Sequence, residues 1–137
     1  MKQVFIDANV LVAVVNKEYP IFSDAARVLS LADRSGYELF TSPVCLAIAF
    51  YFAEKKSGTS LAKKKLKLLL DHIKITTMDD KVVRQAMNNL AIHDVGYGMQ
   101  YYSAITSGCT YIVTENKEDY YFSEIKVVSF KEFLKNE

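Results

Sequence analysis

Two kinds of hydrophobic segment alternate along this chain. Short continuous hydrophobic runs such as residues 2–6 are typical of buried strands, whereas hydrophobic residues repeated every three or four positions, as between residues 22 and 36, are typical of helices. The first pattern predicts strands over residues 2–6, 37–41, 73–77, 110–114 and 126–130. The second predicts helices over residues 8–16, 22–36, 43–56, 60–72, 79–90 and 131–136, and one that begins near Met99 and ends at Gly108. Strands that alternate with helices indicate an α/β fold with a parallel sheet covered on both faces.

Two of the expected helices distribute their hydrophobic residues differently. The helix over residues 43–56 opens with Ser42 and Pro43, which are favoured at the cap and in the first turn. It is hydrophobic almost all round, so we expect it to be largely buried. The helix over residues 79–90 places its hydrophobic residues on one face, namely Val82, Val83, Ala86, Met87 and Leu90.

Composition and charge narrow the class of protein. The chain has 137 residues, half of them hydrophobic, which suits a single domain over residues 1–137. Its net charge of +1 gives no overall attraction to nucleic acid, so any such contact must come from a local patch. Cys45 and Cys109 lack the spacing of metal ligands, which favours reduced, buried thiols in a cytoplasmic protein. No hydrophobic stretch reaches the roughly 18 residues that span a membrane, and we expect neither a membrane segment nor a secretory signal.

A carboxylate interrupts the hydrophobic run at the end of the first expected strand. Asp7 follows this strand directly, and ligands of parallel α/β sheets bind beside the carboxyl ends of the strands. The fourth expected strand is followed in the same way by Glu115, Asn116, Glu118 and Asp119. Oxygen ligands that converge there would suit Mg²⁺ or Mn²⁺, and two such ions can activate water against a phosphodiester. The alternatives are that Asp7 caps the helix that follows and that the later residues form an acidic surface loop.

Four segments of the chain together resemble the PIN domain family, in particular the VapC-type ribonuclease toxins of toxin–antitoxin pairs. These segments are VFIDANVLV, LFTSPVCLAIAFYF, MQYYSAITSGCTYIVTENKEDY and IKVVSFKEFL, in the order in which the family has them. The resemblance implies a three-layer α/β/α fold with a central five-stranded parallel sheet. It also implies metal-dependent cleavage of single-stranded RNA with Mg²⁺ or Mn²⁺ as cofactor, pairing with an antitoxin protein, and a homodimer.

The acidic residues that the family uses are only partly present. Asp7 matches the first family acid, and Asn116 and Asp119 match the segment that supplies the fourth. The resemblance therefore implies that these three residues form the catalytic site and that Asp7 and Asp119 bind the metal. The second acid position holds Ile48 and the third holds Tyr97, and neither residue type is a ligand of Mg²⁺.

Asp94 lies three residues before Tyr97 and is a candidate replacement for the third acid, as is the neighbouring His93. Gly96 and Gly98 leave the local backbone open to several conformations. The alternative is that Asp94 and His93 both lie in a polar turn before a helix.

Lysines and tyrosines supply two further candidate surfaces. A local run of lysines includes Lys63, Lys64 and Lys67, which could contact an RNA backbone or form an ordinary solvated helix face. Tyr97 and Tyr101 lie near the expected site, where they could stack on the bases of a single strand or pack in the core.

The residues leave two functions open. The first is a VapC-like PIN protein that acts on RNA through a weak metal-dependent endoribonuclease site. The second is a catalytically inactive PIN fold that binds nucleic acid or protein. Ile48 and Tyr97 favour the second function on chemical grounds, whereas the segments that match the family favour the first.

Overall fold

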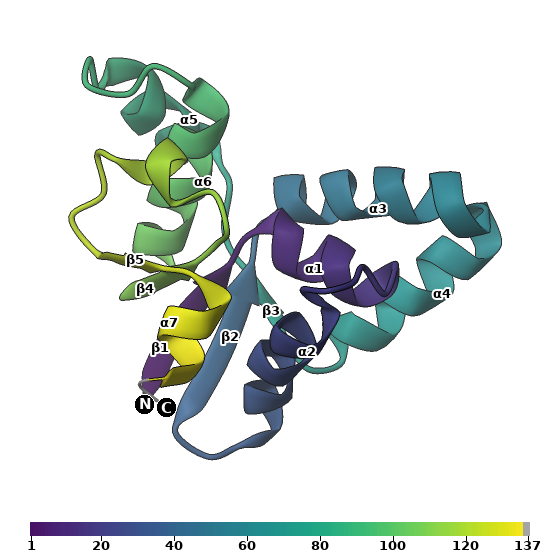
Figure 1. Cartoon of the computed structure of the whole chain (residues 1–137). Helices are drawn as coiled ribbons and strands as arrows, with labels where there is room; N and C mark the ends of the chain where they lie inside the picture. Colours follow the sequence, from purple (N-terminus) through teal and green to yellow (C-terminus); the bar gives the residue numbers. More distant parts are fainter. Residues whose placement is uncertain (136–137) are drawn as a thin grey trace.

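The protein is built around a sheet of five parallel strands in the order β3-β2-β1-β4-β5, in a computed structural model that describes residues 1–135 (Figure 1). The strands are β1 (Lys2–Ile6), β2 (Tyr37–Thr41), β3 (Lys74–Ile75), β4 (Tyr111–Val113) and β5 (Lys126–Val128). Strand β1 is central, since it pairs with β2 on one side and β4 on the other. The predicted five-stranded parallel sheet is confirmed, although β3 is only two residues long.

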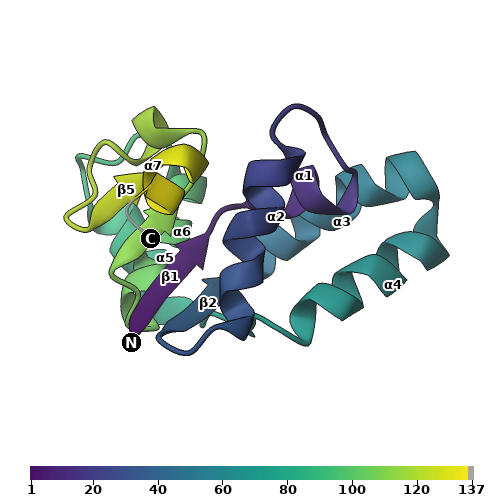
Figure 2. The ribbon, with the colours of Figure 1, turned by 60° about the horizontal axis from the view of Figure 1, so that its bottom comes forward.

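Helices cover both faces of this sheet. Helices α1 to α4 lie on one side, and α5 and α6 lie on the other (Figures 1 and 2). Their bounds are α1 (Ala8–Val15), α2 (Phe22–Ser30), α3 (Pro43–Ser57), α4 (Thr59–Leu70), α5 (Asp80–Asn88), α6 (Val95–Thr106) and α7 (Phe130–Lys135), with short 3₁₀ turns η1 (Leu31–Asp33) and η2 (Lys117–Tyr120). The predicted α/β/α layers are confirmed. The terminal helix was expected to reach Asn136, which lies outside the described residues.

Helix α6 begins earlier than its glycines suggest. It starts at Val95 rather than near Met99, because Asp94 caps it and accepts a hydrogen bond of 2.8 Å from the backbone N–H of Gly96. Gly98 allows α6 to pack closely on α5, since a Cβ there would lie 3.1 Å from the Cβ of Ala86. These glycines therefore serve capping and packing, and they do not interrupt the helix.

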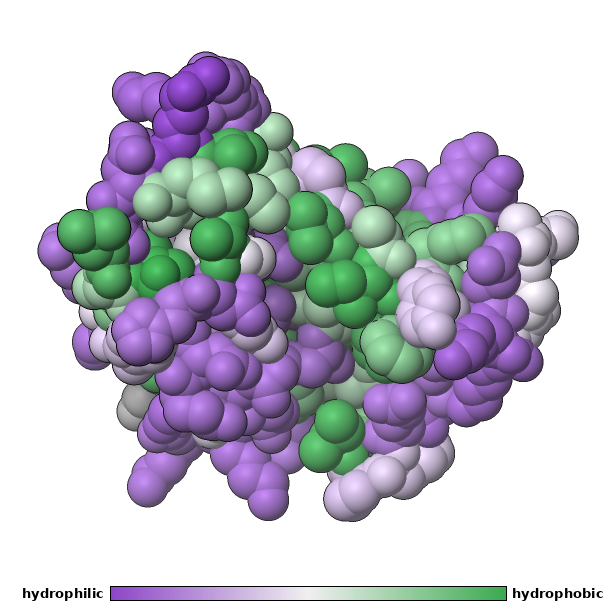
Figure 3. Space-filling view, turned by 90° about the horizontal axis from the view of Figure 1, so that it is seen from above, coloured by the Kyte–Doolittle hydropathy of each residue, from purple (hydrophilic) through white to green (hydrophobic). Residues whose placement is uncertain are grey.

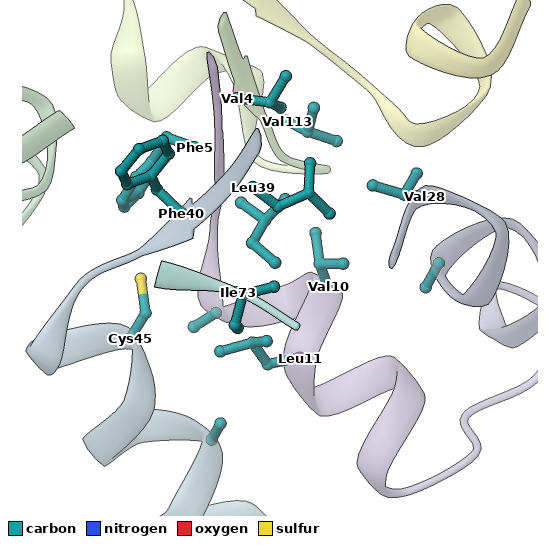
Figure 4. Close-up of a cluster of buried hydrophobic side chains, with 14 of the residues drawn as sticks. Val4, Phe5, Val10, Leu11, Val28, Leu39, Phe40, Cys45, Ile73 and Val113 are labelled. Carbon is teal, nitrogen blue, oxygen red and sulfur yellow. The ribbon is translucent and has the colours of Figure 1, made fainter. Parts of the chain in front are cut away.

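The hydrophobic core lies between the central strands and the helices that cover them. Figure 4 shows Val4 and Phe5 of β1, Leu39 of β2, and Val10 and Leu11 of α1 within this buried cluster. The thiol of Cys45 projects into the same region from the start of α3 (Figure 4). Both Cys45 and Cys109 are free and buried, as expected.

Helix α3 is less buried than its composition predicts. Its buried residues are the small ones, Cys45, Ala49 and Ala53. The large side chains of Ile48, Tyr51 and Phe52 are 39%, 53% and 44% exposed. The expectation of a largely buried helix is wrong, because α1 and α4 cover only one side of α3, and the small residues let them approach it closely. No helix within residues 1–135 has the length and hydrophobicity needed to cross a membrane.

The hydrophobic face expected for α5 is only partly buried. Val82 and Ala86 are buried, whereas Met87 is exposed and Leu90 is 92% exposed. Leu90 lies beyond the end of the helix at Asn88, so the helical spacing no longer places it on the buried face.

Candidate functional site

Asp7 lies at the carboxyl end of the central strand, where the strand order reverses between β1 and β4. It is the N-cap of α1, and its Oδ1 accepts a hydrogen bond of 2.8 Å from the backbone N–H of Ala8. Its Oδ2 accepts a bond of 2.8 Å from the hydroxyl of Thr114, and Sγ of Cys45 lies 3.6 Å from Oδ1. The hydrogen bond from Ala8 confirms the helix cap. Asp7 is only 4% exposed, and each of its carboxylate oxygens accepts a hydrogen bond from a protein donor.

The Asp7 carboxyl group is buried, and no positively charged group of residues 1–135 is among those that shift its pKa. Burial raises this pKa, and the hydrogen bonds from Thr114, Ala8 and Cys45 lower it only in part. The hydroxyl of Tyr120 interacts with the same carboxylate, although it makes no hydrogen bond of ordinary geometry. Burial and the nearby Asp7 raise the pKa of the Cys45 thiol to about 12 and that of Tyr120 well above its ordinary value. Both groups therefore keep their protons at neutral pH and can donate toward Asp7.

A cavity of about 430 Å³ opens beside Asp7, bounded by α1, α3 and the first turns of α6. Its main hydrophobic side chains are Val12, Ile21, Val44, Ile48 and Phe52, and its polar residues are Asp7, Asn9, Glu18, Asp94, Gln100 and Asn116. On the face of the molecule seen from above in Figure 3, hydrophobic side chains gather across the middle between hydrophilic flanks. None of the described residues that line the cavity is basic, so the cavity combines hydrophobic walls with negative charge.

Ile48 and Tyr97 line this cavity together with Asp7. The hydroxyl of Tyr97 interacts with the Asp119 carboxylate, and burial together with this interaction raises the pKa of Tyr97 to about 12. The Tyr97 ring packs edge-on against Tyr120, with ring centroids 5.2 Å apart. Asp119, in η2, does not line the cavity itself. Asp119 interacts with the cavity residue Tyr97, and a metal site shared by Asp7 and Asp119 stays a prediction.

The other candidate residues divide between the cavity and its surroundings. Asn116 and Asp94 both line the cavity. Asp94 also caps α6, so it lies in the polar turn before that helix and borders the cavity as well. His93 does not line the cavity. Its backbone N–H donates a hydrogen bond of 3.1 Å to the hydroxyl of Tyr121, and its ring packs against the Tyr121 ring.

Three polar residues of the cavity were not anticipated, namely Asn9, Glu18 and Gln100. Gln100 follows Tyr97 by three residues in a helix, which places both on one face, so this spacing could have identified it. Asn9 lies two residues after Asp7, close to the strand end. Glu18 lies in the connection after α1, and no local pattern in the sequence points to its position.

These side chains do not fit a two-metal centre. Within residues 1–135, no three histidine, cysteine or acidic side chains are grouped so that they could hold a metal ion. The oxygens of Asp7 accept hydrogen bonds from protein donors, and Oδ1 of Asp94 caps α6. Ile48 and Tyr97 place hydrocarbon and phenol where hard oxygen ligands would be needed. The Mg²⁺ or Mn²⁺ implied by the resemblance stays a prediction that the present side chains do not support.

The residues expected to contact nucleic acid differ in accessibility. The exposed lysines of α4 are Lys63, Lys64 and Lys67, and none of them lines the cavity. Tyr101 is buried, its ring packs edge-on against Phe122 at 5.3 Å, and its hydroxyl accepts a hydrogen bond of 3.1 Å from the backbone N–H of Glu124. This placement matches the interpretation of Tyr101 as a packing residue, because it leaves no ring face for a base.

Two other lysines of the same run have structural contacts. The ammonium group of Lys56 donates to the backbone carbonyl of Asn16, and that of Lys65 donates to the carbonyl of Val15 at 3.1 Å. Both carbonyls lie at the C-terminal end of α1, where the helix dipole favours positive charge. These two lysines therefore join α3 and α4 to α1.

Solved structures of low sequence identity share this fold. VapBC2 from Rickettsia felis, bound to a DNA fragment from its promoter, has a TM-score of 0.70 and 16% identity over 93% of this chain and 98% of that one. DNA-bound VapBC from Salmonella typhimurium has a TM-score of 0.67 and 18% identity over 95% and 99% of the two chains. VapC20 from Mycobacterium tuberculosis, a toxin that cleaves the sarcin-ricin loop, has a TM-score of 0.63 and 16% identity over 80% and 86%.

Sequence comparison identifies the family directly. None of the curated proteins matches this chain significantly. The profile of the PIN domain, however, matches residues 3–118, which includes Asp7, Ile48, Tyr97 and Asn116. This span covers most of the chain, and the fold agrees with that of the VapC proteins. The chain therefore belongs to the PIN domain family.

Proposed function

We propose that this chain is a VapC-like PIN protein that acts by binding a partner protein of the antitoxin type, through a strand-end site that is not built for two-metal cleavage. One observation carries the proposal. Ile48 and Tyr97 line the cavity beside Asp7, where the resemblance to the family calls for carboxylates. An aliphatic side chain and a neutral phenol at these positions provide no carboxylate for a divalent ion, but their apolar surfaces suit the apolar side chains of another protein.

The outer side of α3 extends this hydrophobic surface beyond the cavity. Ile48, Tyr51 and Phe52 are all exposed, and aromatic side chains of this kind commonly anchor protein interfaces. Glu18 and Asp94 add negative charge at the cavity, so a partner segment with basic residues beside hydrophobic ones would be complementary. The structures from Rickettsia felis and Salmonella typhimurium are VapBC complexes of the same fold, which supports a partner of this class.

The test is to look for an antitoxin-like protein encoded beside this chain and to titrate it into the chain in a calorimeter. A hot-spot aromatic contributes about 2 kcal/mol, so Tyr51→Ala should weaken the complex by roughly 30-fold. Leu61→Ala is the matched control, because Leu61 is 45% exposed on α4 and does not line the cavity. The absence of such a neighbour, or of any complex at roughly tens of micromolar, would contradict the proposal.

A second candidate function is binding of single-stranded RNA with weak cleavage that depends on Mg²⁺ or Mn²⁺. It is favoured by the oxygen atoms that Asp7, Glu18, Asp94 and Asn116 bring to one cavity. Titration of Mn²⁺ into the protein, into Asp7→Asn and into the surface control Asp71→Asn, at an exposed residue outside the cavity, tests it. Heat that is lost only in Asp7→Asn would establish a metal site, whereas no heat in any of the three would remove this candidate.

A further inference from the structure

A second hollow lies between α2 and α7, and it is separate from the cavity beside Asp7. The two helices pack against each other, and this α2–α7 hollow has a volume of about 310 Å³. None of its lining residues lines the cavity beside Asp7. They are Asp24, Arg27, Lys131, Leu134 and Lys135. Three cationic side chains therefore border one small volume on a surface that partner binding at α3 does not use.

These three cations have little negative charge beside them within the protein. Arg27 approaches Oδ1 of Asp24 only at 4.0 Å, which is the outer limit of an ion pair. The ammonium groups of Lys131 and Lys135 make no hydrogen bond or ion pair with residues 1–135. Because like charges repel, an anion in the α2–α7 hollow would stabilise this arrangement.

Helix dipoles account for only part of this grouping. Asp24 lies in the first turn of α2, and Arg27 and Lys135 lie in the last turns of α2 and α7, where the dipoles favour their charges. Lys131, however, is the second residue of α7, at the end where the dipole disfavours a cation. Its position is therefore better explained by an anion beside it.

The charges of the α2–α7 hollow select the class of anion. Three cations and one carboxylate leave a net of two positive charges, and a phosphate monoester carries about two negative charges at neutral pH. A phosphodiester or a carboxylate carries only one. The guanidinium of Arg27 has the geometry to donate two parallel hydrogen bonds to phosphate oxygens, while the lysines act as point charges. Leu134 offers an apolar contact to an organic group attached to the phosphate.

We propose that the α2–α7 hollow binds a phosphate dianion, either free or as the phosphate group of a small phosphomonoester, through Arg27, Lys131 and Lys135. All three side chains are exposed, so the binding should weaken as salt screens their charges. The carboxylate of Asp24 opposes the anion and limits its affinity. The inference goes beyond partner binding, since it concerns a different surface and a different class of ligand.

Backbone amide NMR shifts of the full chain, measured at low ionic strength, test this proposal. The probes are inorganic phosphate, glycerol 3-phosphate, dimethyl phosphate and acetate. We expect saturable shifts at α2 and α7 with the first two probes, and binding at least tenfold weaker for the two singly charged ones. Tighter binding of glycerol 3-phosphate than of phosphate would support an organic phosphate as the ligand, and equal binding would support free phosphate.

Three variants locate the site. Arg27→Gln plus Lys131→Gln should weaken phosphate binding at least tenfold. The matched control Lys63→Gln plus Lys64→Gln removes the same charge from exposed positions on α4 and should change the affinity less than about twofold. Asp24→Asn should strengthen binding several-fold, because it removes the carboxylate that repels phosphate. A gain of affinity cannot arise from loss of the fold.

Several results would overturn the proposal. These are no saturable shifts at roughly 10 mM phosphate, equal affinity for acetate and phosphate, or an equal loss of affinity in the two double variants. The last result would show attraction by the overall charge of the protein and no defined site. Far-UV circular dichroism checks the fold of each variant. If Arg27→Gln plus Lys131→Gln does not fold, Asp24→Asn and the ranking of the four probes still decide the outcome. Failure of this test would leave partner binding at Tyr51 untouched.

Discussion

Placing carboxylates at the two positions where the resemblance to the family implies them tests the geometry of the cavity directly. The double variant Ile48→Glu plus Tyr97→Asp would add two acidic groups beside Asp7 and release Asp119 from the Tyr97 hydroxyl. Without metal it should be less stable, because it loses the edge-on contact between Tyr97 and Tyr120 and adds charges that repel Asp7. An aromatic contact of this kind contributes about 0.5–1.5 kcal/mol, which lowers the melting temperature by roughly 2–6 °C in a domain of this size.

Mn²⁺ should reverse this loss in the double variant. A ligand that binds only the folded state, at 100 times its Kd, stabilises the protein by about 2.7 kcal/mol, or roughly 10 °C here. Thermal unfolding followed by circular dichroism, in chelator and in Mn²⁺, measures the shift. The control variant Tyr51→Asp plus Leu61→Glu adds the same charges at exposed positions outside the cavity. If the folded double variant gains no more from Mn²⁺ than this control, the placement of Ile48 and Tyr97 beside Asp7 is wrong.

Three other measurements follow from the structure. Burial raises the pKa of Asp7, so the stability that this group contributes is complete below its unfolded value of 3.8 and is lost as the pH rises through its folded pKa. Asp7→Asn should remove this component from urea unfolding curves measured across the acidic pH range, and an unchanged pH dependence would contradict the burial argument. Charge reversal at Lys63, Lys64 and Lys67 should weaken binding of single-stranded RNA in a filter assay, and unchanged affinity would leave these lysines as a solvated face. The resemblance to the family implies a homodimer, so light scattering at roughly tens of micromolar should report two copies of the chain, and a clean monomer would count against this prediction.

The sheet and the positions around Asp7 were predictable because local patterns determine them. Strand β1 is a continuous hydrophobic run, and a residue that follows a parallel strand lies at the carboxyl edge of the sheet. Ile48 and Tyr97 could be located by counting from motifs that resemble those of the family. The burial of α3 was not predictable in this way, because hydrophobicity along a helix does not show how many neighbours cover it.

The position of Asp119 depends on contacts between distant segments. Tyr97 lines the cavity, packs against Tyr120 and interacts with Asp119 across a sequence separation of more than 20 residues. The hydrogen bond between Ser42 and Gln100 joins distant segments in the same way. No periodicity or local motif reports contacts of this kind.

Lysines that already have contacts within the protein reduce the salt dependence expected for RNA binding by the basic run. The sequence shows a basic run of Lys55, Lys56, Lys63, Lys64, Lys65 and Lys67. Lys56 and Lys65 are held by backbone carbonyls, and Lys55 lies over the ring of Tyr51 at 4.8 Å. Each phosphate contact on a single strand releases about 0.7 counterion, so the three remaining lysines would release about two. A tenfold rise in salt would then lower the affinity by about a hundredfold, instead of the roughly ten-thousandfold expected from six free lysines.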